Sequence, residues 1–243
     1  MTNDSGLRTV VLCGGKGTRA YPHTVELPKP LLEVAGQPVL RHVLDLYARQ
    51  GFDDFVLAAG FKADMIAEFA GNLPSRWRAE VVDTGEEAGT GARVAGCRNH
   101  VGDTFFVTYA DGLGDVDLNA LRRYHDSHPG AATVTTVPLP SQYGTLVCRD
   151  DGRVTEFREK PVLPDHRING GFFVFDRRVF ESWSGDDLER EVLPALAAAG
   201  ELFAYRHRGF WKSMDTYKDA VELTALCAGG APPWIRSPAP ASS

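Results

Sequence analysis

This chain of 243 residues has no excess of basic residues, only four cysteines and no long apolar run. Aspartate and glutamate outnumber lysine and arginine by 32 to 26, which gives a formal net charge of −6. Nucleic acids and anionic membrane surfaces favour proteins with a basic excess, so we expect neither as a partner. The cysteines show no CxxC spacing, so neither a zinc site nor a disulfide framework is predicted. A reduced, cytoplasmic protein is the expected setting.

The apolar runs are too short for export or membrane insertion. Residues 1–8 are polar and lead into a brief apolar stretch at 9–13, which suits neither a signal peptide nor a membrane span. The composition is 43% hydrophobic and 24% charged, which is typical of a globular domain with one sizeable core. We expect a single domain over residues 1–227. Residues 228–243 are rich in Ala, Gly, Pro and Ser and are expected to form a loose tail.

Short β-type runs alternate with helical patterns through the first half of the chain. The expected buried strands there are 9–13, 55–59, 80–82, 105–109 and 132–137. Apolar residues between 40 and 47 recur at i, i+3, i+4 and i+7 and predict an amphipathic helix. Such an alternation indicates βαβ units, hence an α/β fold with a mostly parallel sheet flanked by helices.

The second half of the chain adds an antiparallel element. Runs 143–148 and 154–157 flank the turn Asp150-Asp151-Gly152, which predicts a hairpin. The elements expected after it are a strand at 171–175, helices near 179 and over 188–199, a strand at 202–205 and a helix over 216–226.

The first predicted strand leads directly into a glycine-rich turn, Gly14-Gly15-Lys16-Gly17-Thr18-Arg19. Glycines at the carboxyl end of a parallel strand let the backbone approach a phosphate and aim its N–H groups at it. Arg19 adds a bidentate donor, and Lys29, placed between two prolines, adds a second charge. The spacing matches neither GxxxxGKS/T nor GxGxxG, which excludes P-loop kinases and Rossmann dehydrogenases. A triphosphate-binding loop is one reading, and a simple tight turn is the alternative.

Two aspartates are candidates for a metal site. Asp111 follows the strand at 105–109, so its side chain is expected at the same edge of the sheet as the glycine-rich turn. Asp215 lies far along the chain, just before Thr216 and the last predicted helix. Taken singly, either aspartate also fits a turn or a helix cap.

The order of these motifs resembles a known family. GGKGTR followed by LPKP is similar to the signature of the sugar-nucleotide pyrophosphorylases, which are nucleotidyltransferases. The match runs from about Thr9 to Trp234 and is most similar to the glucose-1-phosphate cytidylyltransferases. Two departures are Ala20, where the family usually has leucine, and a shorter segment between Phe69 and Val81. The further matching segments are 82–85, 90–93, 108–112, 159–161, 168–174, 209–211 and 214–216.

The resemblance implies a fold and a reaction. The fold is a Rossmann-like mixed sheet of the nucleotidyltransferase type A, with a small antiparallel element that binds sugar. The reaction transfers a nucleotidyl group, CMP from CTP foremost, to a sugar 1-phosphate such as glucose 1-phosphate and releases pyrophosphate. A UTP- or dTTP-dependent relative and a non-catalytic nucleotide-sugar sensor are the alternatives. Whether the chain is a monomer or a homo-oligomer stays open.

The resemblance also implies roles for individual residues. Asp111 and Asp215 would hold Mg²⁺, while Arg19, Lys29 and Lys160 would contact the phosphates of the two substrates. The expected nucleotide-binding residues are Gly14, Gly15, Gly17, Thr18, Thr84, Gly91 and Arg93. The expected sugar-binding residues are Gly144, Glu159, Lys160, Asn169 and Gly170.

Overall fold

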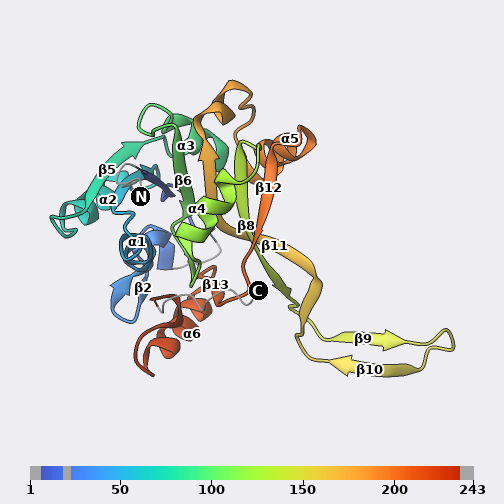
Figure 1. Cartoon of the computed structure of the whole chain (residues 1–243). Helices are drawn as coiled ribbons and strands as arrows, with labels where there is room; N and C mark the ends of the chain where they lie inside the picture. Colours follow the sequence, from blue (N-terminus) through green and yellow to red (C-terminus); the bar gives the residue numbers. More distant parts are fainter. Residues whose placement is uncertain (1–6, 19–22, 236–243) are drawn as a thin grey trace.

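A seven-stranded mixed sheet forms the centre of the computed structural model, which describes residues 7–18 and 23–235 (Figure 1). The strand order is β12-β8-β11-β6-β1-β4-β5, and every neighbouring pair is parallel except the two that β11 makes. The expected α/β fold with a mostly parallel sheet is therefore confirmed. The strands are β1 (Thr9–Leu12), β4 (Asp54–Ala59), β5 (Arg78–Asp83), β6 (Thr104–Tyr109), β8 (Ala132–Pro140), β11 (Val162–Asp176) and β12 (Leu202–Arg206).

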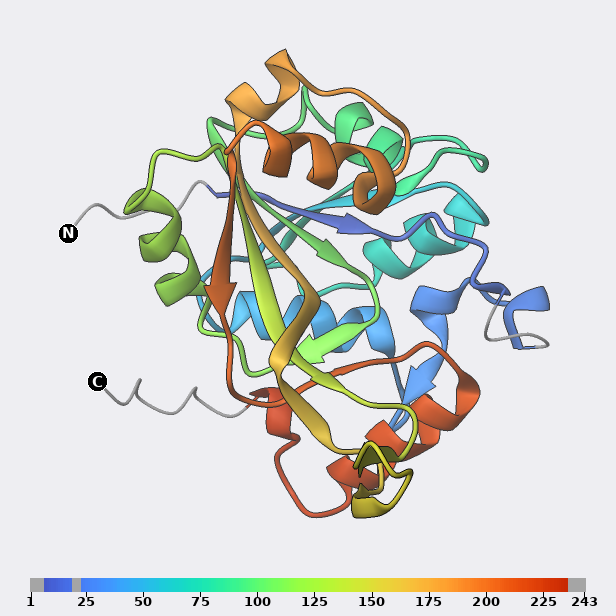
Figure 2. The ribbon, with the colours of Figure 1, turned by 90° about the vertical axis from the view of Figure 1, so that its right-hand side faces the viewer.

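Both faces of the sheet are buried because successive side chains of a strand point to opposite sides. In β1, Val11 belongs to one apolar cluster, and Val10 and Leu12 belong to the other. The first cluster includes residues of α1 (Val39–Ala48), α2 (Ala63–Gly71), α4 (Leu118–Asp126) and α6 (Tyr217–Cys227). The second includes residues of α3 (Thr90–Gly96), the π-helical turn η5 (Leu188–Val192) and α5 (Leu193–Ala198). Figure 2 shows α5 and α1 on opposite sides of the sheet.

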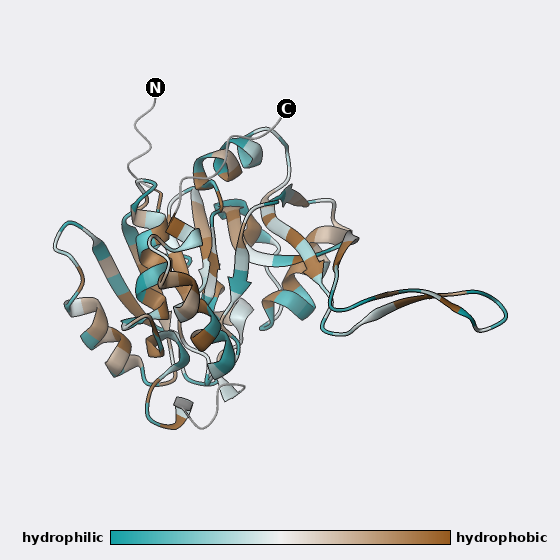
Figure 3. Ribbon diagram, turned by 90° about the horizontal axis from the view of Figure 1, so that it is seen from below, coloured by the Kyte–Doolittle hydropathy of each residue, from teal (hydrophilic) through white to brown (hydrophobic). Residues whose placement is uncertain are grey.

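The predicted hairpin is present and projects away from the body as an arm, residues 141–161 (Figures 1 and 3). Its strands β9 (Thr145–Cys148) and β10 (Val154–Arg158) pair only with each other. Apolar side chains on it are exposed, among them Leu146 at 54% and Phe157 at 62%.

Short elements complete the described part of the chain. The 3₁₀ turns are η2 (His23–Val25), η3 (Lys29–Leu31), η4 (Arg177–Glu181) and η6 (Pro233–Ile235). Two small antiparallel sheets join β2 (Glu33–Val34) to β3 (Gln37–Pro38) and β7 (Gly112–Gly114) to β13 (Trp211–Ser213). None of the helices within residues 7–18 and 23–235 combines the length and apolar character needed to span a bilayer.

The segment after residue 227 is packed in part. The Trp234 side chain is only 1% exposed and meets the His42 ring edge-on at 5.6 Å. This part of the expected loose tail is therefore fixed on the body, because burying an indole removes a large apolar area from water. Residues 236–243 lie outside the described residues.

Candidate active site

A cleft of about 650 Å³ opens at the carboxyl ends of β1 and β6. Ligands of open α/β sheets bind at this edge, where loops from neighbouring strands meet. The cleft is lined by most of the residues expected to bind phosphate, metal and nucleotide. They are Gly14, Gly15, Gly17, Lys29, Arg93, Asp111 and Asp215, and Asn169, which was expected to bind sugar, lines the cleft as well.

Lys29 forms the charged centre of the cleft with Asp111 and Asp215. Its Nζ donates a short hydrogen bond to Oδ2 of Asp111 and a second, 3.2 Å long, to Oδ1 of Asp215. The Lys29 side chain is 11% exposed, whereas the two carboxylates are 22% and 33% exposed. The carboxylates therefore meet at one point while remaining open to the cleft.

The pairing of β7 with β13 brings the two aspartates together. Gly112 and Ser213 are register partners, and the N–H of Met214 donates to the carbonyl oxygen of Asp111 at 2.9 Å. Ser213 Oγ also donates to Oδ2 of Asp215 at 3.0 Å and orients it. These contacts join two segments that are about a hundred residues apart in sequence, as long-range strand pairing does in general.

The helix-cap alternative for Asp215 does not hold. Thr216 is the N-cap of α6, and it forms a capping box with Asp219. Thr216 Oγ1 accepts from the Asp219 N–H, and the Asp219 carboxylate accepts from the Thr216 N–H. The Asp215 side chain is thus directed to Lys29 rather than to the first turn of the helix.

Two glycines of the loop after β1 are required by close contacts. Gly17 has a φ of +61°, and a Cβ there would lie 2.6 Å from Cβ of Lys29. A Cβ at Gly14 would lie 2.1 Å from Nη1 of Arg93. Any larger side chain at either position would displace a charged residue of the cleft.

Arg93 lies beneath the loop and is only 3% exposed. Its Nη2 donates to the carbonyl oxygens of Gly14 at 2.8 Å and Glu86 at 3.1 Å. Its Nη1 donates to the carbonyl oxygen of Ala59 at 3.0 Å and to Oγ1 of Thr84 at 2.7 Å. Burial lowers the pKa of Arg93, and nearby acidic groups act in the opposite direction. The guanidinium therefore joins the glycine-rich turn, the end of β4 and the loop after β5.

The other expected nucleotide-binding residues lie around this centre. Gly15 and Thr18 are exposed, and Gly15 lines the cleft. Gly91 is buried at the start of α3, where its N–H donates to the carbonyl oxygen of Asp186 at 2.8 Å. Thr84 Oγ1 donates to the carbonyl oxygen of Ala59 at 2.7 Å. Arg19 lies outside the described residues.

A polar network forms a further wall of the cleft. Tyr109 Oη donates a short hydrogen bond to Oε1 of Glu189 and accepts from Nδ2 of Asn169 at 3.1 Å. Oε2 of Glu189 accepts from Oγ1 of Thr90 at 2.7 Å. Burial and the neighbouring Glu189 raise the pKa of Tyr109, so the phenol stays protonated and can donate. Gly170 is close by, and its carbonyl oxygen accepts from Nε1 of Trp211 at 2.7 Å.

Three expected sugar-binding residues gather outside the cleft, at the base of the arm. Glu159 and Lys160 are 65% and 61% exposed, and the Lys160 Nζ lies 3.9 Å from Oε1 of Glu159. A Cβ at Gly144 would lie 3.2 Å from Oε2 of Glu159. The structure thus brings these three together but does not place them in the cleft lining, whereas Asn169 lines it.

The sequence from residue 8 to residue 226 matches the family described as Nucleotidyl transferase. The chain belongs to the nucleotidyl transferase family. This nucleotidyl transferase is 37% identical over 253 residues to the probable glucose-1-phosphate cytidylyltransferase of Bacillus subtilis (strain 168), covering 94% of this chain and 99% of the relative. It is 35% identical over 254 residues to the glucose-1-phosphate cytidylyltransferase of Salmonella typhimurium, covering 94% and 98%. The structure of HddC from Yersinia pseudotuberculosis complexed with GMP-PN has a TM-score of 0.69 at 21% identity, covering 90% of this chain and 98% of that one, and shares the fold.

The carboxylates of this nucleotidyl transferase fit the preferences of Mg²⁺. That ion takes one or two carboxylates, and phosphate oxygens and water complete its coordination shell. Asp111 and Asp215 each direct one oxygen to the same cationic atom, the Lys29 Nζ, and both stay accessible from the cleft. Within the described ranges no cluster of three or more His, Cys, Asp or Glu side chains is arranged for a metal. A hydrated ion shared with substrate phosphates is therefore the kind of ion that these residues suit.

Several residues that line the cleft were not expected from the sequence. Tyr109, Asp187 and Glu189 line it, together with Trp211 and Ser213. Tyr109 could have been inferred from its place at the end of a predicted strand. Glu189 carries no local signal, because an exposed glutamate at the start of a helical segment is typical of any helix N-terminus.

Proposed function

We propose that this nucleotidyl transferase joins CMP from CTP to glucose 1-phosphate, forming CDP-glucose and pyrophosphate with the help of Mg²⁺. The observation that carries the proposal is the convergence of Lys29, Asp111 and Asp215 beside a glycine-rich loop in one cleft. The choice of CTP and glucose 1-phosphate is supported by the names of relatives that match nearly their whole length.

The proposed reaction needs no protein nucleophile. An oxygen of the sugar phosphate attacks the α-phosphorus of the triphosphate, a new P–O bond forms, and the bond from the α-phosphorus to the bridging oxygen of pyrophosphate breaks. The attacking oxygen is already ionised near neutral pH, so no base has to remove a proton. Catalysis then rests on aligning two anions and neutralising their charge.

The cationic groups of the cleft suit this task. Lys29 is held by two carboxylates, which fixes its ammonium at the centre of the cleft, where we assign it to the α-phosphate. We assign Arg19 to the β- and γ-phosphates, whose charge grows as pyrophosphate leaves. Asp111 and Asp215 would hold Mg²⁺, which supplies further neutralisation of phosphate charge when bound.

The two substrates are assigned to different walls of the cleft. The base and ribose belong near Gly14, Gly15, Thr84, Gly91 and Arg93, where backbone groups are close to the cleft.

The hexose belongs at the opposite wall, where Asn169, Tyr109 and Glu189 offer donors and acceptors for hydroxyl groups. Lys160 and Glu159 stay assigned to the sugar phosphate and the sugar hydroxyls. This assignment requires the base of the arm to approach the cleft once substrate is bound, because both side chains are exposed in the free chain.

The deciding experiment is a panel of five nucleoside triphosphates crossed with several sugar 1-phosphates, read as release of pyrophosphate. We expect the highest kcat/KM with CTP and glucose 1-phosphate. Cytosine differs from uracil at position 4, and a mismatched donor or acceptor there costs about 1–3 kcal/mol, or roughly 10–100-fold in kcat/KM. A preference for UTP or dTTP would overturn the cytidylyl proposal, and no turnover with any pair would favour a non-catalytic sensor.

The metal assignment has its own test. Asp111→Asn should lower kcat by about 10²–10³-fold at saturating Mg²⁺, and a chelator should abolish activity of the wild type. Asp150→Asn makes the same change in the exposed turn of the arm and should leave kcat unaltered. Near-normal turnover by Asp111→Asn would show that this carboxylate does not hold the metal.

The residues assigned to the two substrates' phosphates can be tested one at a time. Lys160→Ala should raise the KM for glucose 1-phosphate, and Arg19→Ala should weaken CTP binding or slow the chemical step. Each variant is titrated with both substrates. If Lys160→Ala changed only the KM for CTP, the two phosphate sites would have to be exchanged.

A further inference from the structure

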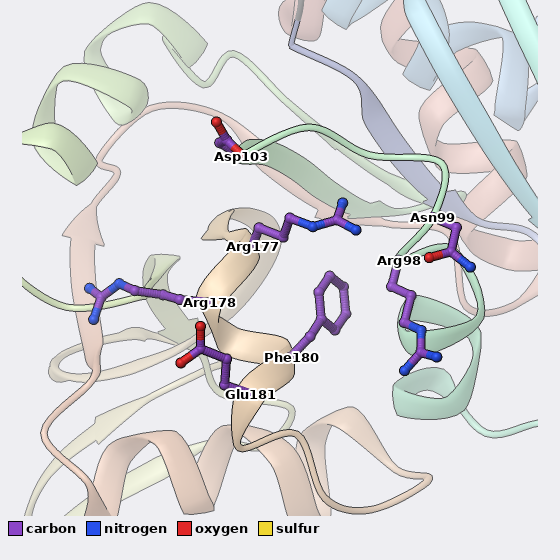
Figure 4. Close-up of a pocket in the computed structure, with 7 residues that line it drawn as sticks. All are labelled: Arg98, Asn99, Asp103, Arg177, Arg178, Phe180 and Glu181. Carbon is purple, nitrogen blue, oxygen red and sulfur yellow. The ribbon is translucent and has the colours of Figure 1, made fainter.

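A second hollow, of about 560 Å³, lies at the opposite end of the sheet from the active-site cleft (Figure 4). It is formed where Asp103 precedes β6 and where Arg177 follows β11, strands that pair through Thr104 and Asp176. Asp111 of the cleft follows the other end of β6, so the two hollows are about 20 Å apart along that strand. The active site therefore does not account for this second hollow.

One corner of the hollow is positively charged. Figure 4 shows Arg98 and Asn99 on one side of the Phe180 ring and Arg178 and Glu181 on the other, with the Arg177 guanidinium beyond the tip of the ring. Arg177 Nη1 donates to the carbonyl oxygen of Val101 at 2.8 Å. Within residues 7–18 and 23–235, neither Arg98 nor Arg177 forms an ion pair with a carboxylate.

The third arginine of the hollow is already neutralised. Arg178 lies 3.3 Å from a carboxylate oxygen of Asp176 and 3.2 Å from one of Glu201. Two carboxylates, Asp103 and Glu181, also line the hollow, and Glu181 lies on the Arg178 side of the ring. Arg98 and Arg177 are thus the two arginines of the hollow that form no ion pair within the described residues. In a chain with a net charge of −6, such a pair of guanidinium groups is a local site of attraction for an anion.

The aromatic wall of the hollow is held in place. The Phe180 ring stacks on Phe105 with centroids 5.6 Å apart and an interplanar angle of 4°. Trp183 packs against Phe180 at 5.4 Å. A ring fixed on a buried strand residue offers a preformed apolar surface beside the guanidinium groups, which is the usual construction of a small-molecule site.

We propose that Arg98, Asn99, Arg177 and Phe180 form a second ligand site that binds a phosphate-bearing small molecule. The two guanidinium groups and the Asn99 amide would donate to the phosphate oxygens, and the Phe180 ring would contact the organic part of the ligand. The chain segments that carry this site also lead to the active-site cleft. Arg98 follows α3, whose first turn carries Thr90 of the cleft, and η4 leads along the chain to Glu189.

The test is calorimetric titration of the full chain with inorganic pyrophosphate. The wild type should show two classes of site, one in the cleft and one at Arg98. Lys29→Ala should weaken only the first, so failure of the proposed function and failure of this proposal are distinguishable. Arg98→Gln should weaken only the second, by about tenfold or more, because a charge-assisted hydrogen bond to phosphate is lost.

Matched controls keep the result interpretable. Arg149→Gln makes the same change of charge in the arm and should leave both sites intact. Arg98→Gln removes no internal hydrogen bond of the described residues, so its Tm should equal that of the wild type. In the Lys29→Ala background, where the cleft is weakened, tryptophan fluorescence should respond to pyrophosphate through Trp183 and should lose that response when Arg98→Gln is added.

To learn which kind of phosphate compound the second site prefers, pyrophosphate, CMP and ribose 5-phosphate are each titrated into Lys29→Ala. Tighter binding of CMP than of ribose 5-phosphate indicates a nucleotide stacked on Phe180, and equal affinities indicate recognition of phosphate alone. A single class of site in the wild type, or equal affinities in the wild type and Arg98→Gln, would refute the proposal.

Discussion

Replacing Arg93 by methionine removes the donor that joins three loops beneath the active-site cleft. The guanidinium donates to five acceptors, and two of them, the carbonyl oxygens of Ala59 and Gly14, are fully buried with it. Methionine fills a similar volume but donates no hydrogen bond, so these oxygens lose a partner.

The expected loss of stability follows from these two acceptors. Each oxygen keeps another donor, the Phe61 N–H at Gly14 and Thr84 at Ala59, so neither is left unsatisfied. What each loses is a buried hydrogen bond to a charged group, worth about 1.5–3 kcal/mol, so the variant should lose about 3–4 kcal/mol of unfolding free energy. For a chain of this size each kcal/mol lowers Tm by about 2–4 °C, which predicts a decrease of roughly 10 °C. Urea and thermal unfolding followed by circular dichroism measure both quantities.

A surface arginine provides the matched control. Arg158 lies on the arm, is 63% exposed and pairs with Glu156, so Arg158→Met should cost less than about 0.5 kcal/mol. Arg93→Met should also weaken CTP and UTP alike, because both nucleotides need the loop at Gly14 that the guanidinium holds. A loss below about 1 kcal/mol would show that water replaces the guanidinium and would refute the reasoning.

Three further predictions concern other parts of the chain. A hydrogen bond from Arg8 holds the pKa of Glu80 below its ordinary value of 4.5; the stability difference between wild type and Glu80→Gln should therefore be largest above that pH and should disappear as the pH falls below it, and a difference that persisted in acid would contradict the pairing. Burial raises the pKa of Cys97 to about 12, while Cys148 is exposed; iodoacetamide at about pH 8 should alkylate Cys148 first, and Cys148→Ser should remove the fast phase seen by mass spectrometry. Trp234→Ala should lower the unfolding free energy by about 3–5 kcal/mol, as expected for an indole that is 1% exposed, whereas an unchanged urea midpoint would mean that the residue is not packed in solution.

Local sequence patterns predicted the strands and helices because each buries its apolar side chains at a characteristic spacing, every second residue in a strand and every three to four residues in a helix. Most of the expected strands differ from the observed ones by one to three residues, as 55–59 does from Asp54–Ala59. The helix expected from the apolar spacing at 40–47 is Val39–Ala48. The strand expected at 171–175 is the exception, because β11 begins at Val162. Its register with β8 shifts twice, so the first part of the strand shows no regular alternation of apolar and polar residues.

The candidate site was predictable in its chemistry and only partly in its geometry. Gly17 and Lys29 lie in the neighbouring segments GGKGTR and LPKP, which were both assigned to the triphosphate, so their proximity was expected from the sequence. Glu189 joined the cleft through Tyr109 and Thr90, which are remote from it in the chain, and no spacing rule could indicate that contact.

The sequence by itself determined the alternation of strands and helices, the glycine-rich turn and the resemblance to the nucleotidyl transferases, because each depends on neighbouring residues and on local backbone preference. Tertiary structure alone decided that β7 pairs with β13 and so brings Asp215 to Lys29 and Asp111. It also decided that Arg93 is buried beneath the loop rather than exposed on a helix, and that Lys160 lies at the base of the arm. Contacts between distant segments depend on how the elements pack around the whole core, and no short stretch of sequence contains that information.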